Sequence, residues 1–590
     1  MAQLLEYHRR EDKPVWWAFF ARCDMSPDEL ADDSESIGAL TEHPEHAPVT
    51  DRQSYIYTLR FPEQEHRLAA GGDICDPATQ SGVSVVEIDN NAGLLRVRRA
   101  QRRGGEPLPQ ALIPGGPYRT PEQRAALRRL ATAIVDGGLR GPGAFRAARD
   151  LLCFDAPRIV GLPAGSPLQA GGAPPIEALR DLVAALDESC LFIQGPPGSG
   201  KTWTGAQLIV HLLRAGKRVG VTANSHKAIH NLLHEIEAAA DEHDVSFQGL
   251  KKASSGNDES RFVSGFGDRF ITNSCNGASF PPPHEDGVLL TAGTAWLYAP
   301  ESMDDAVDYL FIDEAGQLSL ADTLAVTTAA RNLVLLGDSL QLAQVSQAVH
   351  PGNAGSSVLE HLLGDHGTIP SQRGIFLDHT RRMHPDVCRF ISEVVYENRL
   401  ASIPDCAVQR VSAPGALAGT GVRFLPVIHE GNTRTSTEEA DVIAAAIEKL
   451  RAGRWTNDKG ETESLALSQI MVVTPYNAQV RLLLDRLPTG VRVGTVDKFQ
   501  GQEAAVVFFS MATSSGAEVP HNVEFLYSRN RLNVAVSRAR CLAVLVCNPD
   551  LLHIKCRSAE QMRLVNALCR LAEMADSGDH APTPFLAATA

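Results

Sequence analysis

The stretch that decides the fold reads Gly195-Pro196-Pro197-Gly198-Ser199-Gly200-Lys201-Thr202 and matches the spacing G-x-x-x-x-G-K-[ST]. It follows the apolar run 191–194 and precedes an amphipathic segment, the strand–loop–helix setting that this motif requires. Small residues let backbone N–H groups curve around phosphates at a helix N-terminus, so all eight residues are predicted to contact nucleotide. Lys201 adds a positive charge, and the Thr202 hydroxyl is a ligand for Mg²⁺. The stretch therefore predicts a phosphate loop that binds ATP with Mg²⁺.

Two carboxylates, Asp313 and Glu314, directly follow the apolar run 309–312. The carboxyl ends of strands in a parallel sheet carry ligand-binding groups, so this pair is expected beside the phosphate loop. Asp313 is predicted to hold Mg²⁺, and Glu314 to orient and deprotonate the attacking water. These assignments suit phosphoryl transfer, which depends on positioning and charge compensation.

Two arginines, Arg382 and Arg538, lie in the Arg-rich runs 380–385 and 531–540. An isolated arginine is more often a surface ion-pair partner, but the phosphate loop favours arginine fingers that offset charge on the transferred phosphoryl group. Because both runs fall in the second half of the chain, the fingers would make closure of two domains depend on ATP.

Apolar runs alternate with helical patterns after residue 176, which is typical of parallel sheets covered by helices on both faces. We interpret them as tandem α/β domains over 176–375 and 376–575. Within the first, the polar segment of about 238–287 predicts a peripheral insertion or mobile loop. The strand-like runs are 191–194, 219–222, 289–291, 310–313 and 333–337, then 423–427, 470–475, 491–496, 505–510 and 542–547.

Residues before 176 show a different pattern. Residues 1–48 are predicted to be helical, with Ser26 as the N-cap of a helix, Pro27 at its first position and Glu29 completing a capping box. Short β-rich runs over 49–115 predict a small antiparallel β-barrel, and 116–175 predicts a helical arm followed by a linker. The tail 576–590 is predicted to be disordered.

The charge balance limits how nucleic acid could bind. A formal net charge of -15 over 590 residues disfavours nonspecific coating of nucleic acid, but it is compatible with a narrow basic track. An arginine cluster in the β-rich region has two interpretations, contact with a nucleic-acid backbone or a solvated strand face. The cluster comprises Arg96, Arg98, Arg99, Arg102 and Arg103.

Cysteine usage and apolar runs bear on the compartment. No apolar run reaches about 18 residues, and the start lacks the layout of a secretion signal. We therefore expect a cytoplasmic protein without a membrane segment. The 11 cysteines include no Cys-x-x-Cys pair and are predicted to be reduced and buried. Cys541 and Cys547, an even number of residues apart in an apolar strand, are predicted to share a face.

With these motifs in order, residues 180–550 resemble a superfamily 1B helicase of the group that includes RNA-surveillance and nuclease-fused DNA helicases. The resemblance implies two tandem RecA-like P-loop domains. The matching segments are 195–202, 223–232, 290–294, 313–317, 337–342, 382–385, 473–479, 495–503 and 531–540.

The resemblance also implies roles that the residues alone do not. Gln341 would sense the γ-phosphate, Glu503 would contact the ribose, and Tyr476 would pack near the base. Several hydroxyl side chains would touch the backbone of a nucleic-acid strand without reading its sequence. These are Thr222, Ser225, Thr291, Thr294, Thr474 and Thr495.

The N-terminal segments 7–11 and 61–66 further resemble the helicase half of large bacterial proteins that join a RecB-like nuclease to this motor. No nuclease half is visible, so a nuclease is a candidate partner. The chain departs from the family pattern in three places. Residues 176–190 lack a glutamine-bearing adenine motif, Asn224 and His226 replace the usual Pro and Asn, and Ala343-Gln344 replaces the usual prolines after Leu342.

Two classes of function agree with these features. The first is a monomeric, ATP-driven helicase or translocase on single-stranded or tailed duplex nucleic acid, DNA rather than RNA, moving 5′ to 3′ in DNA repair or processing. The second is an ATP-gated clamp or scaffold for a nuclease, and an RNA helicase is a further alternative. An intact Glu314 favours turnover over clamping, and a protein-remodelling ATPase conflicts with the paired motifs of the second domain.

Overall fold

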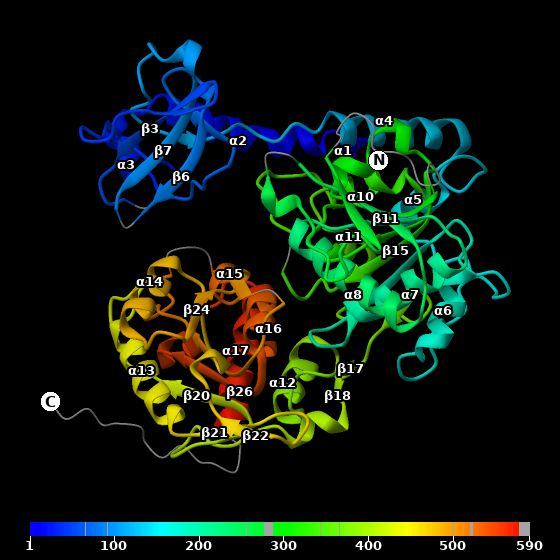
Figure 1. Ribbon diagram of the computed structural model, residues 1–590. Coiled ribbons are helices and arrows are strands. Elements are labelled where there is room, and N and C mark those ends of the chain that lie inside the picture. The colour runs from blue at the N-terminus through cyan, green and yellow to red at the C-terminus, as the bar shows by residue number, and fades with distance from the viewer. Residues whose placement is uncertain are drawn as a thin grey trace.

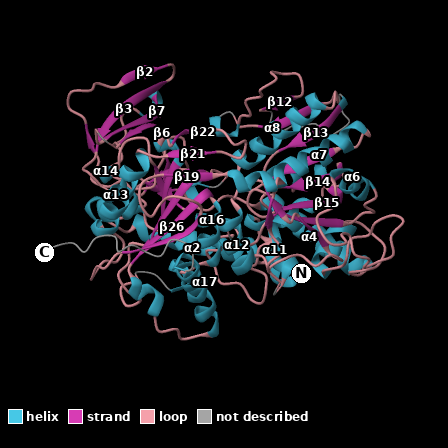
Figure 2. Cartoon of the chain, turned by 90° about the horizontal axis from the view of Figure 1, so that it is seen from below, coloured by secondary structure: helices cyan, strands magenta, loops and turns pink. Residues whose placement is uncertain are grey.

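The computed structural model describes residues 1–576 apart from 65, 91, 255–256, 276–286, 343, 365, 500 and 520–522. It shows two α/β lobes and a separate β-rich module near the N-terminus (Figure 1). Seen from below, the strands of the two lobes form separate groups, each flanked by helices (Figure 2). The predicted tail 576–590 lies, after Asp576, outside the described residues.

The first lobe is built on an eight-stranded sheet in the order β12-β11-β13-β10-β14-β15-β9-β16, and every neighbouring pair is parallel. Its strands are β9 (Cys190–Gln194), β10 (Val219–Thr222), β11 (Gln248–Lys252), β12 (Ile271–Ser274), β13 (Val288–Ala292), β14 (Val307–Ile312), β15 (Ala330–Gly337) and β16 (Gly374–Phe376). Its helices are α6 (Ile176–Ala184), α7 (Lys201–Arg214), α8 (His226–Glu242), α9 (Ala295–Tyr298), α10 (Leu320–Thr327) and α11 (Val358–Leu363).

Both faces of this sheet are buried, which explains why its strands are almost continuously apolar. Alternate residues enter different cores: Phe192 packs with α10 and α11, whereas Leu191 and Ile193 pack with α6, α7 and α8. The segment over about 238–287, predicted as a peripheral insertion or mobile loop, contributes the end of α8 and the two outermost strands on one side of the sheet, β11 and the edge strand β12. Parallel pairing with the sheet outweighs the polar composition of this segment.

The second lobe contains a five-stranded parallel sheet in the order β20-β26-β25-β23-β24. Its strands are β20 (Gly421–Pro426), β23 (Ile470–Thr474), β24 (Arg492–Thr495), β25 (Ala504–Ser510) and β26 (Ala539–Cys547). Its helices are α12 (Pro385–Val395), α13 (Thr437–Arg451), α14 (Asn477–Arg486), α15 (Val523–Leu526), α16 (Arg529–Ser537) and α17 (Ala559–Asp576). Small additional strands are β17 (His379–Thr380), β18 (Ala401–Ser402), β19 (Arg410–Ser412), β21 (Arg454–Thr456) and β22 (Thr462–Ser464). The two sheets confirm the predicted mixed α/β fold.

The prediction that Cys541 and Cys547 share a face is wrong. Cys541 packs in the core beneath α13, and Cys547 packs in the core on the opposite face of the sheet. The register of β25 and β26 shifts where Ala504 pairs with Ala539 and Val506 pairs with Leu542. One extra residue in β26 therefore reverses the alternation of side chains.

The N-terminal part contains α1 (Ala2–Leu5), α2 (Tyr7–Cys23) and α3 (Pro27–Asp32), followed by short strands. Ser26 caps α3 and Glu29 returns a hydrogen bond to the N-cap, so the predicted capping box is confirmed. The strands form antiparallel sheets of five and three strands, and closure into a barrel stays a prediction. They are β1 (Thr41–Glu42), β2 (Val49–Asp51), β3 (Ser54–Arg60), β4 (Ile74–Asp76), β5 (Ser81–Gly82), β6 (Ser84–Asp89), β7 (Leu94–Ala100) and β8 (Ile113–Pro114).

Two of the module's arginines are neutralised by neighbours, since Arg96 pairs with Glu87 at 3.1 Å and Arg98 pairs with Asp51 at 2.9 Å. Exposed pairs of this kind favour the interpretation of a solvated strand face. Among the described residues, no helix combines the length and the apolar character needed to cross a bilayer.

The helical arm packs against the first lobe. It consists of α4 (Pro121–Gly137) and α5 (Arg146–Cys153), whose apolar residues join the core beneath α10. Arg129 donates to Asp304 at 2.8 and 2.9 Å and to the carbonyl of Ala299, which fixes α4 on the lobe. The arm is therefore part of the first lobe's core.

If so, Leu130→Ala should lower the free energy of unfolding of that lobe by about 2 to 5 kcal/mol, because Leu130 is fully buried there. Denaturant unfolding monitored by circular dichroism measures this change. The control is Val135→Ala on the same helix, since Val135 is 83% exposed and its truncation should shift the midpoint little. Equal midpoints for the two variants would contradict the packing.

Candidate nucleotide site at the seam of the lobes

The phosphate loop lies between β9 and α7, as predicted. Gly198 and Gly200 have φ of 75° and 79°, a left-handed conformation that glycine adopts without strain. A Cβ on Gly198 would lie 2.5 Å from Thr380 Oγ1 and 2.6 Å from Arg382 Cβ. The carbonyls of Pro197 and Gly198 accept hydrogen bonds from Thr380 Oγ1 at 3.0 Å and from the Arg381 N–H at 2.8 Å. The loop is thus held against the chain that enters the second lobe.

The acidic pair faces Lys201 at the end of β14. Lys201 Nζ lies 3.0 Å from Glu314 Oε1 and 3.6 Å from Asp313 Oδ1. Glu314 itself has φ of 50°, an uncommon conformation for a residue with a side chain and one often found at functional sites. Its N–H donates to Asp313 Oδ1 at 2.8 Å. The strand end therefore aims both carboxylates at the lysine.

Burial and charge oppose each other within this group. Burial alone would lower the pKa of Lys201, but the carboxylates of Glu314 and Asp313 outweigh it and raise that pKa above its usual value. Burial raises the pKa of Asp313, and Lys201 offsets this only in part. The lysine stays charged, and the acids compensate its charge when no phosphate is near.

Arg382 and Arg538 both line the cavity that contains Lys201, Asp313 and Glu314, and its volume is about 680 Å³. Arg382 Nε donates to Glu503 Oε2 at 2.6 Å and is therefore already paired. Arg538 Nη1 donates to the carbonyl of Gln502 at 3.3 Å. Burial, followed by repulsion from Arg382, lowers the pKa of Arg538 to about 9. Of the two, Arg538 has more unused hydrogen-bonding capacity.

Several buried donors around this cavity have no hydrogen-bond partner within the described part of the chain: Ser199 Oγ, Lys201 Nζ, Arg538 Nε and Arg538 Nη2. Lys201 Nζ lies within ion-pair distance of Glu314 Oε1, at 3.0 Å. Buried donors without acceptors are costly, so the site fits an anionic ligand with many acceptor oxygens, such as a polyphosphate. Thr202 and Asp313, the predicted Mg²⁺ ligands, both line the cavity.

Gln341 lies in the same cavity and links it to the second lobe. Its Nε2 donates to Asp338 Oδ2 at 3.1 Å and to the carbonyl of Gly195 at 3.4 Å. Asp338 also accepts from the Tyr396 hydroxyl at 2.5 Å, and Asn533 Nδ2 donates to that hydroxyl at 2.9 Å. Sequence reasoning missed this network. Asn533 fell within a recognised segment, but Tyr396 carried no signal.

Two predicted nucleotide contacts differ in outcome. Glu503 lines the cavity, but its oxygens are engaged by Arg382 and Arg540, which lower its pKa although burial alone would raise it. Contact with the ribose stays a prediction. Tyr476 is not among the residues that line the cavity. It is buried in the second lobe, where its ring stacks on Phe525 at 5.9 Å and its hydroxyl accepts from Thr513 at 3.3 Å.

Burial divides the predicted strand contacts into two groups. Thr222, Thr291 and Thr474 are 1%, 0% and 0% exposed, because they lie at or next to the carboxyl ends of strands that helices cover, so their hydroxyls are not accessible to a nucleic-acid strand in this structure. Ser225 is exposed, and Thr294 and Thr495 are half-buried. These three hydroxyls stay predicted contacts.

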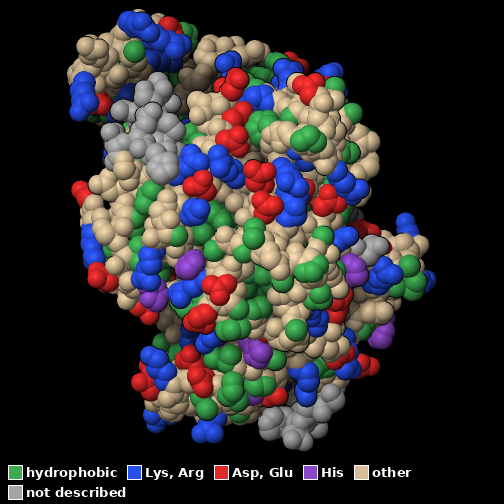
Figure 3. All heavy atoms as spheres, turned by 90° about the vertical axis from the view of Figure 1, so that its right-hand side faces the viewer, with side chains coloured by type: hydrophobic (Ala, Val, Ile, Leu, Met, Phe, Trp, Pro, Cys, Tyr) green, Lys and Arg blue, Asp and Glu red, His purple; other side chains and the backbone are tan. Residues whose placement is uncertain are grey.

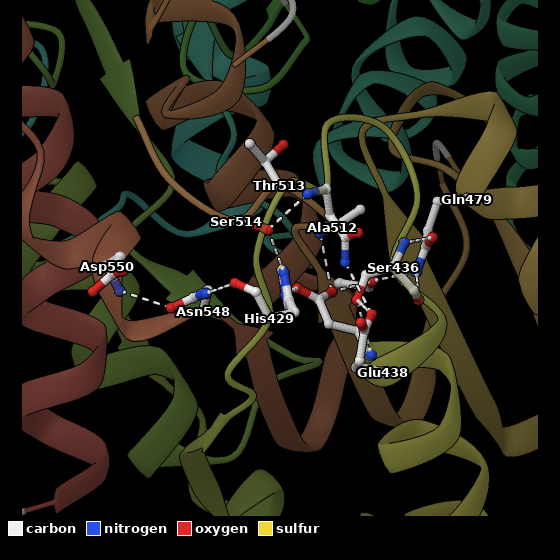
Figure 4. A network of polar contacts seen from close by, with 12 residues as sticks. His429, Ser436, Glu438, Gln479, Ala512, Thr513, Ser514, Asn548 and Asp550 are labelled. Carbon is white, nitrogen blue, oxygen red and sulfur yellow. Dashed lines mark hydrogen bonds and ion pairs between the residues drawn. The ribbon is translucent and has the colours of Figure 1, made fainter. Parts of the chain in front are cut away.

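Gln479, in the recognised segment 473–479, also serves the second lobe's own structure. Figure 4 shows a buried polar network in which the Ser436 N–H donates to Gln479 Oε1 at 2.8 Å and His429 contacts Ser514 at 2.7 Å. Glu439 completes it by accepting from the Ser510 hydroxyl at 2.6 Å. The segment thus stabilises the start of α13.

Charged side chains on one outer face of the molecule are mixed in sign. Figure 3 shows Lys, Arg, Asp and Glu intermingled on that face without one broad basic patch.

Comparisons with known proteins agree with this architecture. Two models of an AAA domain match, one over residues 176–362 and the other over 354–550. The chain is 26% identical over 432 residues to the Regulator of nonsense transcripts 1 homolog of Drosophila melanogaster, covering 62% of this chain and 34% of that protein. It is 23% identical over 393 residues to the DNA replication ATP-dependent helicase/nuclease JHS1 of Arabidopsis thaliana, covering 63% and 28%.

A further relative is the DNA polymerase alpha-associated DNA helicase A of Schizosaccharomyces pombe, 24% identical over 401 residues and covered to 59% in both chains. The solved complex of Arterivirus nonstructural protein 10 (helicase) with DNA aligns with a TM-score of 0.40 and 15% identity, covering 84% of this chain and 77% of that one. The chain spans about a third of the length of the first two relatives.

One AAA-domain model matches each lobe, and the chain is similar to ATP-dependent and DNA helicases over about three fifths of its length.

Arg538→Ala should lower kcat for ATP hydrolysis by about 10³-fold or more, the range known for arginine fingers. Binding of a nonhydrolysable ATP analogue should change little, because Arg538 compensates charge that develops during transfer. Steady-state kinetics and fluorescence titration measure the two quantities. Arg389→Ala, an exposed arginine of α12, is the matched control and should leave kcat unchanged. A finger role is excluded if both variants retain wild-type kcat.

Proposed function

We propose that the chain is an ATP-driven translocase that separates duplexes, acts on single-stranded or tailed duplex DNA, and moves 5′ to 3′ in DNA repair or processing. One observation carries this proposal: Lys201, the acidic pair and Arg538 line a single cavity to which both lobes contribute. Hydrolysis at such a seam changes how the lobes fit together, which is the requirement for a motor.

ATP with Mg²⁺, when bound, supplies the phosphoryl group that is transferred to water. Lys201 would then pair with the phosphates instead of with Glu314, because the phosphates and Glu314 compete for the same ammonium group. Its departure leaves the Glu314 carboxylate able to accept a proton from water. Arg538 and Lys201 provide the positive charge. The ion pair of Lys201 with Glu314 therefore keeps the base occupied until a phosphate replaces it.

We propose that the nucleobase occupies a second cavity of about 670 Å³, which adjoins the phosphate loop at Ser199, Gly200 and Trp203. Pro175 and Ile176 give it an apolar wall, and Trp203, which is 46% exposed, offers a ring for stacking. In this proposal Trp203 has the base-stacking role that the resemblance gave to Tyr476. Glu177, from the segment that lacks the family's glutamine motif, also lines the cavity.

The strand is proposed to cross a third cavity of about 410 Å³, lined by Asn224, Thr294, Trp296 and Gln317. Gln317 ends the short turn that follows Glu314, so one segment borders both the strand and the water-activating carboxylate. This supports coupling of strand binding to hydrolysis. A nuclease partner and a monomeric state stay predictions from the resemblance. The clamp alternative is less favoured because Glu314 faces the phosphate cavity.

Single-stranded DNA is expected to raise the rate of ATP hydrolysis many-fold, because strand binding promotes closure of the seam. A phosphate-release assay with and without single-stranded DNA and RNA measures this, and 5′-tailed and 3′-tailed duplexes report unwinding polarity. The motor proposal fails if neither nucleic acid stimulates hydrolysis. Stronger stimulation by RNA would favour the RNA-helicase alternative.

Lys201→Ala should abolish nucleotide binding or turnover, whereas Glu314→Gln should bind ATP and hydrolyse it with a rate lowered by about 10²-fold or more. The two effects differ because the lysine holds phosphate and the glutamate activates water. Filter binding and single-turnover hydrolysis separate them. A normal rate for Glu314→Gln would show that another group is the base.

A further inference from the structure

The N-terminal helix α2 contacts the segment 344–350 through several hydrogen bonds. This segment begins three residues after Gln341, the predicted phosphate sensor. Tyr7 and Glu11 are four residues apart and therefore lie on one face of α2. Figure 1 shows α2 running from the first lobe to the β-rich module. These two residues contact Gln344 and His350, which lie more than three hundred positions later in the sequence, just after the motif that ends at Leu342.

Glu11 accepts an unusual number of hydrogen bonds for a partly exposed carboxylate. Its Oε1 accepts from Ser346 Oγ at 2.6 Å and from the Ala348 N–H at 3.2 Å, and it contacts His350 Nε2 at 2.6 Å. Its Oε2 accepts from the Gln347 N–H at 3.0 Å. Although burial alone would raise the pKa of Glu11, these donors lower it. One carboxylate thus contacts four of the five positions from 346 to 350.

Tyr7 and His8 extend the grip. The Tyr7 ring stacks on His350 with centroids 4.5 Å apart, and its hydroxyl accepts from Gln344 Nε2 at 2.6 Å. His8 Nε2 lies 2.9 Å from Asp322 Oδ1 on α10. Tyr7 and His8 are both buried. The N-terminal segment 7–11 is therefore anchored to the first lobe by three of its five side chains.

The sequence explains why this loop needs an external support. Ala343-Gln344 stands where the resembling helicases have prolines, and proline would fix the backbone φ of the loop from within. Without proline the chain after Leu342 has more accessible conformations. Gln344 uses its side chain to bond Tyr7 instead. Gln344 is thus both a departure from the family pattern and a contact of the N-terminal helix.

We propose that Glu11, assisted by Tyr7, is a positioning residue that holds the 344–350 loop and thereby sets Gln341 against the phosphate cavity. This rests on the proposed ATPase function. Glu11 lies outside the phosphate cavity and acts through Gln341. By holding the loop, it keeps the Gln341 amide in position to donate hydrogen bonds to Asp338 and to the carbonyl of Gly195. The same residues fix the start of the helix that leads to the β-rich module.

The test uses the full chain with Glu11→Gln. We expect kcat for ATP hydrolysis to fall about tenfold while KM for ATP stays within about twofold, because a misplaced phosphate-sensing group weakens the transition state more than the bound substrate. Glu6→Gln is the matched control on the neighbouring turn, where the carboxylate pairs with exposed Arg9, and it should retain wild-type kcat.

A double variant distinguishes positioning from general destabilisation. In a Gln341→Ala background, adding Glu11→Gln should change kcat by less than about twofold, since the residue through which Glu11 acts is gone. Losses that multiply, or a Glu11→Gln kcat within about twofold of wild type, would overturn the proposal. A wild-type chain without ATPase activity would instead overturn the proposed function.

If Glu11→Gln also loses binding of an ATP analogue, the milder variant Ser346→Ala tests the proposal, because it removes only one of the hydrogen bonds to Glu11. A kcat lowered about two- to threefold with unchanged analogue binding supports the proposal. Unchanged kcat in Ser346→Ala overturns it.

Discussion

The interaction on which the site depends is the buried contact of Lys201 with Asp313 and Glu314. An ammonium group and two carboxylates lie together at the carboxyl end of a parallel sheet, with the lysine side chain only 8% exposed. Removing such charges from water is costly unless they compensate one another. Without a ligand, the two carboxylates neutralise the lysine and so stabilise the arrangement. When a phosphate replaces them at Lys201, both carboxylates face the bound nucleotide.

Polar contacts, in addition to apolar packing, hold the second lobe against this site. Thr380 and Arg381 bond to the carbonyls of the phosphate loop, and Asn533 reaches the Tyr396 hydroxyl that in turn bonds Asp338. These contacts join the phosphate loop, Asp338 beside Gln341, and helix α16, whose C-cap is Arg538. A change of ligand at Lys201 therefore affects both lobes, which is the physical basis for proposing a motor and not a static binding module.

Much of the first lobe follows from local pattern. Continuous apolar runs place β9, β14 and β15 because strands buried on both faces need no polar alternation. The phosphate loop follows from glycine spacing, and the helix start at Ser26 follows from capping chemistry. The strands β11 and β12 within the polar region 238–287 were not predicted, because their pairing at the side of the sheet, and not their composition, decides their conformation.

The sequence by itself determined the residues of the chemistry: a lysine, two carboxylates and arginines whose types and spacing allow little else. Only the tertiary structure decided which side chains are accessible. Thr222 and Thr474 look like ligands in a motif but are covered by packed helices, and one extra residue in β26 turns Cys541 away from Cys547. It also brought Glu11 to the loop behind Gln341, a contact between distant segments that depends on where helices dock and that no local pattern encodes.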